Sequence, residues 1–356
     1  MRETMPGRIR AVWHRVVPLA VLVVATLPGT TSASFAPVSP PETAAAHGDP
    51  EPSPGPLFPV GGEYELLSAF PDPRALLERG AMGIDKTAAT EVDVSSSIFD
   101  EAQVISIYGY PGICFMGELG CHEPEDAIAP LLDIAGEYEV LNEELETGRD
   151  VIPALHLIVD VAQPRPQPDG SYLFRMPEER IAEYVELARE HDLLLFLDLQ
   201  IGWTDALEGV QRIEEFLLEP FVHLALDAEF ATEPYGQPPG SVIGTLDAPD
   251  VNAVQRYLAD LVHEHQLPPK VFVLHKFTPR MLINTDQYET VEGVDLTITM
   301  DGYGAPEPKI GGYERYALAD YSERAGFKLF WHWDEPLMSP RDVMNMRQAP
   351  DYVIYQ

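Results

Sequence analysis

Basic residues are scarce in this chain of 356 residues. There are 23 Lys and Arg against 58 Asp and Glu, which gives a formal net charge of −35 at pH 7. Nucleic acids and anionic membrane surfaces attract proteins that carry a basic patch. The charge balance therefore argues against both as partners. It is typical of an acidic surface that repels itself, and attraction of a cationic substrate is the alternative interpretation.

Cysteine is nearly absent, and the two present are Cys114 and Cys121. Their spacing is not that of a zinc finger, and no second pair exists to complete a four-cysteine site, so a structural zinc of that kind is not expected. In an exported protein, an even pair this close in sequence indicates one disulfide that closes a small loop.

Long hydrophobic runs are missing as well. The apolar run Val16–Leu27 is too short to span a bilayer comfortably, and it lies between four arginines and the small residues Thr31-Ser32-Ala33. This pattern predicts a secretory signal peptide over residues 1–33, with an uncleaved anchor as the alternative. We therefore expect a secreted protein with no stable membrane anchor after cleavage. The Pro-rich residues 34–60 are expected to form a disordered linker, and residues 61–103 an N-terminal extension packed on the main domain.

Eight short apolar segments follow, with amphipathic stretches between them. Alternation of this kind predicts parallel strands joined by right-handed helical crossovers. Eight units over about 250 residues are typical of a TIM barrel. We therefore predict an α/β fold in which residues 104–356 form a closed (β/α)8 barrel. An open doubly wound sheet is the alternative, but no Gly-x-Gly-x-x-Gly turn follows the first strand. The expected strands are Val104–Tyr108, Val151–Val161, Leu193–Gln200, Val222–Phe230, Lys270–Phe277, Val294–Asp301, Phe327–Trp333 and Tyr352–Tyr355.

The fourth expected strand ends in two carboxylates. Because side chains alternate along a strand, Asp227 and Glu229 share a face with His223 and Ala225. Reacting groups of such barrels lie at the carboxyl ends of the strands. The inward faces of the strands, together with aromatic and acidic residues at their tips, give further candidates for substrate binding, with Asp301 as a third catalytic candidate. The binding candidates are Tyr108, Tyr110, Asp160, Asp198, Gln200, His275, Tyr303, His332, Trp333, Asp334 and Glu335.

Carboxylates beside aromatic rings suit a carbohydrate, which has hydroxyl groups at its edge and C–H groups on its faces. Cleavage of a glycosidic bond needs one protonated carboxyl and a second group that stabilises or attacks the anomeric carbon. Two close carboxylates push their pKa values apart, so one can remain protonated near neutral pH. We expect Glu229 to be the proton donor and a carbohydrate to be the substrate, with no cofactor and no metal ion.

The segment that ends in Asp227-x-Glu229 resembles the end of the chitinase-type (family 18) glycoside hydrolase signature, Asp-x-x-Asp-x-Asp-x-Glu. The resemblance implies that Glu229 is the general acid and that Asp227 orients an acetamido group of the substrate. Met300-Asp301-Gly302-Tyr303 is similar to the Met-x-Tyr-Asp segment of that family, with Tyr and Asp exchanged. Ala225 and Val222 stand where the family has its earlier aspartates.

Four other interpretations remain open. The family-25 muramidases also use an Asp-x-Glu, and a barrel with its nucleophile on strand seven would pair Glu229 with Glu335. A divalent-metal hydrolase would draw on ligand-type residues, although the His-x-His of an amidohydrolase is absent from strand one. A barrel derived from a hydrolase could also bind a glycan without cleaving it. The ligand-type residues are His156, Asp160, Asp198, Asp227, His275, His332 and Asp334.

The net charge of −35 generates a prediction about salt. Sodium chloride screens repulsion between exposed charges, so the melting temperature should rise from low to molar salt. Differential scanning calorimetry at several salt concentrations measures the effect. A flat or falling curve would mean that neighbouring cations already compensate the acidic residues.

Overall fold

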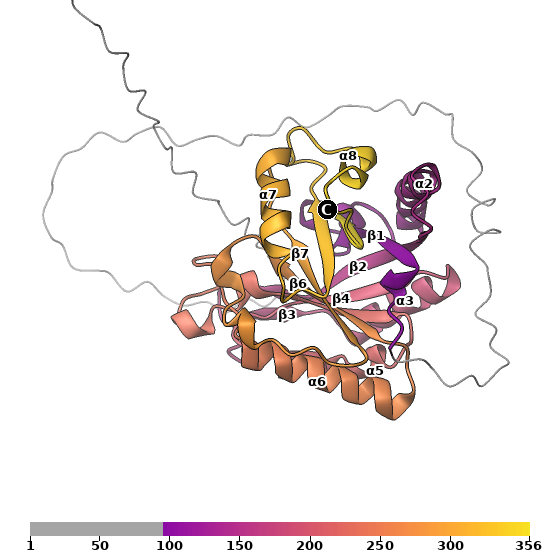
Figure 1. Ribbon diagram of the computed structural model, residues 1–356. Helices are drawn as coiled ribbons and strands as arrows, with labels where there is room; N and C mark the ends of the chain where they lie inside the picture. The colour runs from indigo at the N-terminus through magenta and orange to yellow at the C-terminus, as the bar shows by residue number, and fades with distance from the viewer. Residues whose placement is uncertain (1–94) are drawn as a thin grey trace, which may run out of the picture. The chain divides into compact units, whose positions relative to one another are not determined.

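The structure is a computed structural model that describes residues 95–356, and the expected signal peptide and linker lie outside this part of the chain. Eight parallel strands follow one another around a barrel (Figure 1). β1 pairs with both β2 and β9, which closes the barrel and confirms the predicted (β/α)8 fold. The barrel strands are β1 (Ala102–Gly109), β2 (Asp150–Ala162), β4 (Leu194–Gln200), β5 (Val222–Asp227), β6 (Lys270–Lys276), β7 (Val294–Met300), β8 (Arg324–Leu329) and β9 (Tyr352–Tyr355).

Helices connect the strands and cover the outside of the barrel. The longest, α6, begins at a capping box in which Asp247 and Asp250 accept each other's backbone N–H groups. No helix of residues 95–356 has the length and apolar character that a membrane span needs. The α-helices are α2 (Ile128–Glu144), α3 (Glu178–Glu190), α4 (Ala206–Arg212), α5 (Glu214–Leu217), α6 (Ala248–His265), α7 (Pro306–Tyr316) and α8 (Pro340–Met344).

Short elements complete the loops. The strand β3 (Leu173–Arg175) pairs antiparallel with β2 and extends the sheet beyond the barrel. The 3-10 turns are η1 (Ile98–Asp100), η2 (Cys114–Met116), η3 (Glu118–Cys121), η4 (Glu125–Ala127), η5 (Ala228–Phe230), η6 (Glu233–Tyr235), η7 (Pro279–Met281) and η8 (Thr285–Gln287).

Two hydrophobic clusters follow from the alternation of side chains along the strands. Outward residues such as Ile107, Leu197 and Leu226 pack under the helices. Inward residues such as Phe196 and Tyr352 fill the barrel and form a separate cluster. Burial of side chains of this size contributes about 1.5–3 kcal/mol each, so both layers stabilise the closed barrel.

Three expected strands differ from the structure by two residues or more at one end. β1 begins at Ala102, so the barrel starts two residues before the expected position. β5 ends at Asp227, and the chain turns into η5 instead of continuing to Phe230. β8 covers Arg324–Leu329 and lies earlier in the chain than the expected strand. The expected strand was placed too late because the aromatic segment Phe330–Trp333 resembles the end of a strand. In the structure this segment forms a turn, with the Phe330 and Trp333 rings stacked.

The expected disulfide between Cys114 and Cys121 is present. It joins η2 to η3 in the loop after β1, on the side of the barrel where the strands end. In the chain-entropy model a loop this short gains about 2–3 kcal/mol from its cross-link. The disulfide therefore fixes one wall above the barrel.

A glycine on β8 gives a prediction about packing. A Cβ added at Gly326 would overlap Thr299 Oγ1 and lie 3.0 Å from Thr299 Cβ and 3.1 Å from its Cα. Gly326→Ala should therefore destabilise the fold by about 1–3 kcal/mol, as overpacking does. Gly311→Ala is the matched control, because nothing lies within 4 Å of its added Cβ and it is in helix α7. Urea unfolding that finds the two variants equally stable would contradict the packing of β7 against β8.

Candidate active site

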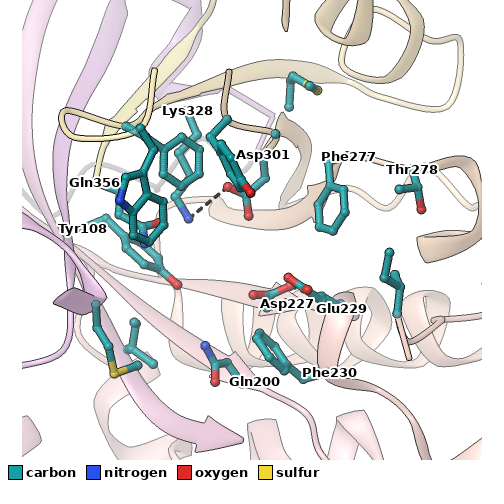
Figure 2. Close-up of a pocket in the computed structure, with 18 of the residues that line it drawn as sticks. Tyr108, Gln200, Asp227, Glu229, Phe230, Phe277, Thr278, Asp301, Lys328 and Gln356 are labelled. Carbon is teal, nitrogen blue, oxygen red and sulfur yellow. Dashed lines mark hydrogen bonds and ion pairs between the residues drawn. The ribbon is translucent and has the colours of Figure 1, made fainter. Parts of the chain in front are cut away.

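A cavity of about 410 Å³ opens at the carboxyl ends of the barrel strands. It takes residues from most of the strands and from the loops that follow them, which is where barrels of this type carry their reacting groups. Figure 2 shows the labelled lining residues pointing toward one shared space. The polar lining consists of Tyr108, Gln200, Asp227, Glu229, Thr278, Asp301, Tyr303, Lys309, Lys328 and Gln356.

Asp227 and Glu229 form the acidic pair of this cavity. Asp227 is the last residue of β5, and its Oδ1 accepts the backbone N–H of Glu229 at 3.1 Å. This bond caps η5, so the chain turns while both carboxyl groups keep facing the cavity. The sequence predicted that both side chains face the same way. The prediction assumed a strand that continues through Glu229, whereas in the structure the 3-10 turn η5 gives this orientation.

Burial governs the protonation of this pair. It raises the pKa of Asp227 to about 7, with the charges of Asp301 and Asp198 acting in the same direction. Burial also raises the pKa of Glu229, to about 8, and the negative charge of Asp227 is the second cause of this increase. Removing a carboxylate from water penalises its charged form, and a neighbouring carboxylate adds to that penalty. The pair therefore retains a proton near neutral pH.

Asp301 is in the opposite electrostatic situation. Burial alone would raise its pKa, but Lys328 and then His275 outweigh burial and hold the pKa below its usual value. The Lys328 Nζ lies 3.1 Å from Asp301 Oδ1 and 3.6 Å from the centre of the Tyr108 ring. A cation over an aromatic face is attracted by the ring, so Tyr108 helps to fix this lysine. The cavity thus contains a protonated and an ionised carboxyl together.

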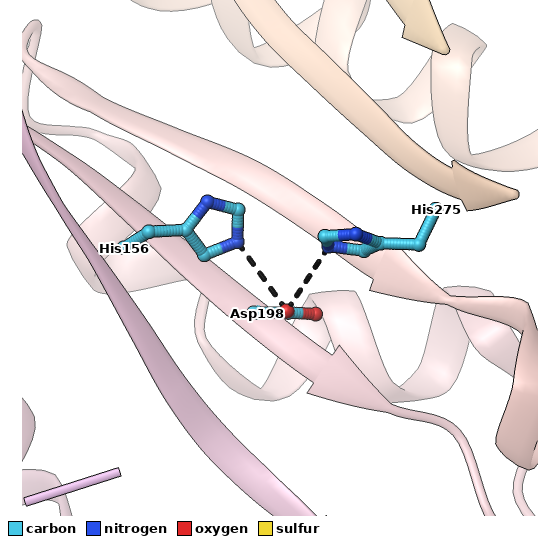
Figure 3. A group of neighbouring side chains, drawn as sticks. All are labelled: His156, Asp198 and His275. Carbon is cyan, nitrogen blue, oxygen red and sulfur yellow. Dashed lines mark ion pairs between the residues drawn. The ribbon is translucent and has the colours of Figure 1, made fainter. Parts of the chain in front are cut away.

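Beneath the cavity, His156, Asp198 and His275 meet inside the barrel (Figure 3). All three are fully buried. Burial lowers the pKa of His156 to about 4. For His275, the charges of Asp198 and Asp301 outweigh burial and raise the pKa to about 10. Of the seven ligand-type residues named from the sequence, these three gather into one group.

Aromatic side chains form one side of the cavity mouth. The Trp333 ring lies 5.4 Å from Phe115, 5.7 Å from Tyr303 and 5.9 Å from Phe330, measured between ring centroids. Phe115 and Tyr303 are 48% and 46% exposed, so large apolar faces remain open to a ligand. Phe115 directly follows Cys114, and the disulfide therefore holds this platform in place.

Asp160 does not face the cavity, although alternation from His156 placed it inward. The pairing of β2 with β4 shifts between Ile158 and Asp160, which is the signature of a β-bulge. Beyond this shift Val161 faces the cavity, and Asp160 pairs with Arg212 outside the barrel. Asp160 is therefore part of the contact between β2 and α4.

Four further candidates also lie outside the cavity lining. Asp334 is buried, accepts the N–H groups of Gly304 and Phe330, and pairs with Lys309 at 2.8 Å. It joins the loops after β7 and β8. His332 and Glu335 are exposed in the turn after β8, and Tyr110 packs edge-on against Phe174. Seven candidates do line the cavity, namely Tyr108, Gln200, Asp227, Glu229, Asp301, Tyr303 and Trp333.

Sequence reasoning missed the two lysines. In the expected strand, Lys328 has the same phase as His332, which is predicted to face inward, and it stands alone between Phe327 and Leu329. A single charge in such a strand indicates a buried partner, so this signal was present. Lys309 lies on α7, and nothing local to its sequence indicates that its Nζ reaches Asp334 and the carbonyl groups of Gly302 and Lys328.

Comparisons with known proteins give little. No profile of a known protein family matches the chain, and no curated protein is significantly similar to it. A solved structure described as a GH5-4 broad specificity endoglucanase from an uncultured bacterium aligns with a TM-score of 0.35 and 7% sequence identity. The alignment covers 76% of this chain and 90% of that one. A similarity this low assigns no function.

The raised pKa of Glu229 generates a prediction about stability. Between the ordinary Glu pKa of 4.5 and the raised pKa of about 8, the folded protein holds a proton that the unfolded chain releases. The unfolding free energy should therefore fall as the pH rises through this window. Glu229→Gln removes this titration. The difference in melting temperature, variant minus wild type, should therefore increase as the pH is raised from about 5 to 8. Exposed Glu335→Gln is the control, and a pH-independent difference for Glu229→Gln would contradict the raised pKa.

Proposed function

We propose that this protein is a secreted glycoside hydrolase that cleaves a polysaccharide or cell-wall glycan by acid catalysis. The observation that carries the proposal is the pair Asp227 and Glu229, two adjacent carboxyl groups that face one cavity with raised pKa values. Environments that separate the protonation states of nearby carboxyl groups are a feature of glycosidase sites. The secretory signal expected over residues 1–33 supports export of the protein.

Glu229 is the proton donor to the leaving oxygen, because it retains its proton near neutral pH and lies partly open at the cavity. Asp227, which binds the N–H of Glu229, holds the turn and orients the substrate group beside the bond that breaks. Asp301, fixed by Lys328 at 3.1 Å, faces the same cavity and stabilises positive charge that develops at the anomeric carbon. This division of roles is the one that glycoside cleavage requires.

The lining fits a sugar on physical grounds. Phe115, Tyr303 and Trp333 supply exposed apolar faces on which the C–H face of a pyranose ring can stack. The carboxyl groups of Asp227, Glu229 and Asp301 line the same cavity and offer acceptors to hydroxyl groups. A chitinase-like use of Asp227 would favour substrates that carry an acetamido group, so N-acetylated glycans are the first substrates to test.

Glu229→Gln keeps the shape of the side chain and removes the acidic proton. We expect turnover of a responsive glycan to fall by about 100-fold or more, the scale of general acid catalysis, with binding of the glycan largely unchanged. Glu335→Gln is the matched control, since Glu335 is exposed in the turn after β8 and does not line the cavity. Reducing-end assays on N-acetylated and neutral glycans measure turnover, and calorimetry measures binding.

Two outcomes would contradict the proposal. If Glu229→Gln and Glu335→Gln lose turnover equally, Glu229 is not the proton donor. Wild-type protein that binds glycans but turns none over would favour the non-catalytic binding barrel, for which the aromatic platform alone is sufficient.

A further inference from the structure

The group of His156, Asp198 and His275 has more polar atoms than the surrounding protein satisfies. His156 Nε2, His275 Nε2 and both carboxylate oxygens of Asp198 are buried and have no hydrogen-bond partner among the described residues. The three side chains are fully buried inside the barrel. They come from the neighbouring strands β2 and β4 and from β6, which β5 separates from β4. Leaving so many buried polar atoms unpaired is costly, so an additional partner is expected there.

The distances suit a shared cation better than hydrogen bonds. Asp198 Oδ2 lies 3.3 Å from His156 Nε2 and 3.2 Å from His275 Nε2. A charge-assisted hydrogen bond between such groups is about 2.7–2.9 Å long. Ligands at about 2.0–2.1 Å from one tetrahedral ion lie about 3.3 Å from each other. One ligand atom from each residue also falls within 4.8 Å of the other two.

The outer nitrogens of both histidines face other polar groups of the protein. His156 Nδ1 hydrogen-bonds the Tyr352 hydroxyl at 2.7 Å, whereas His275 Nδ1 makes no hydrogen bond to the described residues and faces Asp301 Oδ2 at an ion-pair distance of 3.2 Å. A metal-binding histidine characteristically uses its second nitrogen in this way, which directs the first nitrogen at the ion. In both residues it is Nε2 that points toward Asp198 (Figure 3).

From these three observations we propose that His156, Asp198 and His275 bind one divalent transition-metal ion of the zinc class inside the barrel. Two imidazoles and one carboxylate select zinc over magnesium or calcium, which prefer oxygen ligands. None of the three residues lines the cavity, so the ion lies beneath the site. Its effect reaches the cavity through His275 and Asp301, and it therefore positions Asp301 while taking no part in proton donation. The inference goes beyond the proposed function and does not depend on it.

The test uses the full chain, stripped with a chelator and returned to chelator-free buffer. Zinc titration by calorimetry, and zinc content after desalting, should give close to one ion per chain for wild type. Asp198→Asn and His156→Gln should each weaken zinc binding by about 100-fold. His223→Gln is the matched control, because His223 is also buried in the barrel but accepts the N–H of Val271 and lies outside the group. Cobalt should give visible bands of a nitrogen and oxygen site in wild type and in His223→Gln, and none in Asp198→Asn or His156→Gln.

Equal zinc content in wild type, Asp198→Asn and His156→Gln would mean surface binding and would overturn the proposal, as would wild type that holds no zinc. If Asp198→Asn fails to fold by circular dichroism, His156→Gln and the cobalt spectrum decide. Glu229→Gln should retain zinc in full, so loss of turnover and loss of metal are separable results.

Discussion

The buried charge of Asp198 is the constraint on which the centre of this barrel depends. A carboxylate at the core is costly unless cations or donors surround it. His275 connects Asp198 to Asp301, and Lys328 pairs with Asp301 at the cavity floor. A continuous chain of polar contacts therefore runs from the barrel interior to the cavity. Substituting any member removes a partner from its neighbours, so the electrostatics of the interior and of the site are coupled.

The barrel itself was predictable because its signal is repeated. Each strand buries an outward row such as Leu195 and Leu197 under helices, and the pattern recurs eight times along the chain. A misplaced end, as in β8, does not disturb that count. The disulfide was predictable for a related reason, since only one pairing of Cys114 and Cys121 exists.

The site was less predictable because it depends on single irregularities. The shift in β2 after Ile158 moves Asp160 out of the cavity, and no residue type in that apolar run announces it. The turn at Asp227 keeps Glu229 in the cavity, although the strand ends two residues earlier. Alternation gave the right face for Glu229 and the wrong face for Asp160. The alternation rule assumes a regular strand, so it cannot show where a bulge or a turn interrupts that strand.

The carboxyl groups of the cavity differ in protonation because, in the described part of the chain, only one of them, Asp301, is paired with a lysine. Asp301 has the Lys328 Nζ at 3.1 Å. Asp227 Oδ1 instead accepts a backbone N–H, and Glu229 has two acidic neighbours. Burial acts on all three carboxyl groups, so the lysine decides which of them ionises. Lys309 is committed to Asp334 and to two carbonyl groups, which keeps it away from Glu229. The placement of two lysines, neither of them conspicuous in the sequence, therefore determines which carboxyl group can donate a proton.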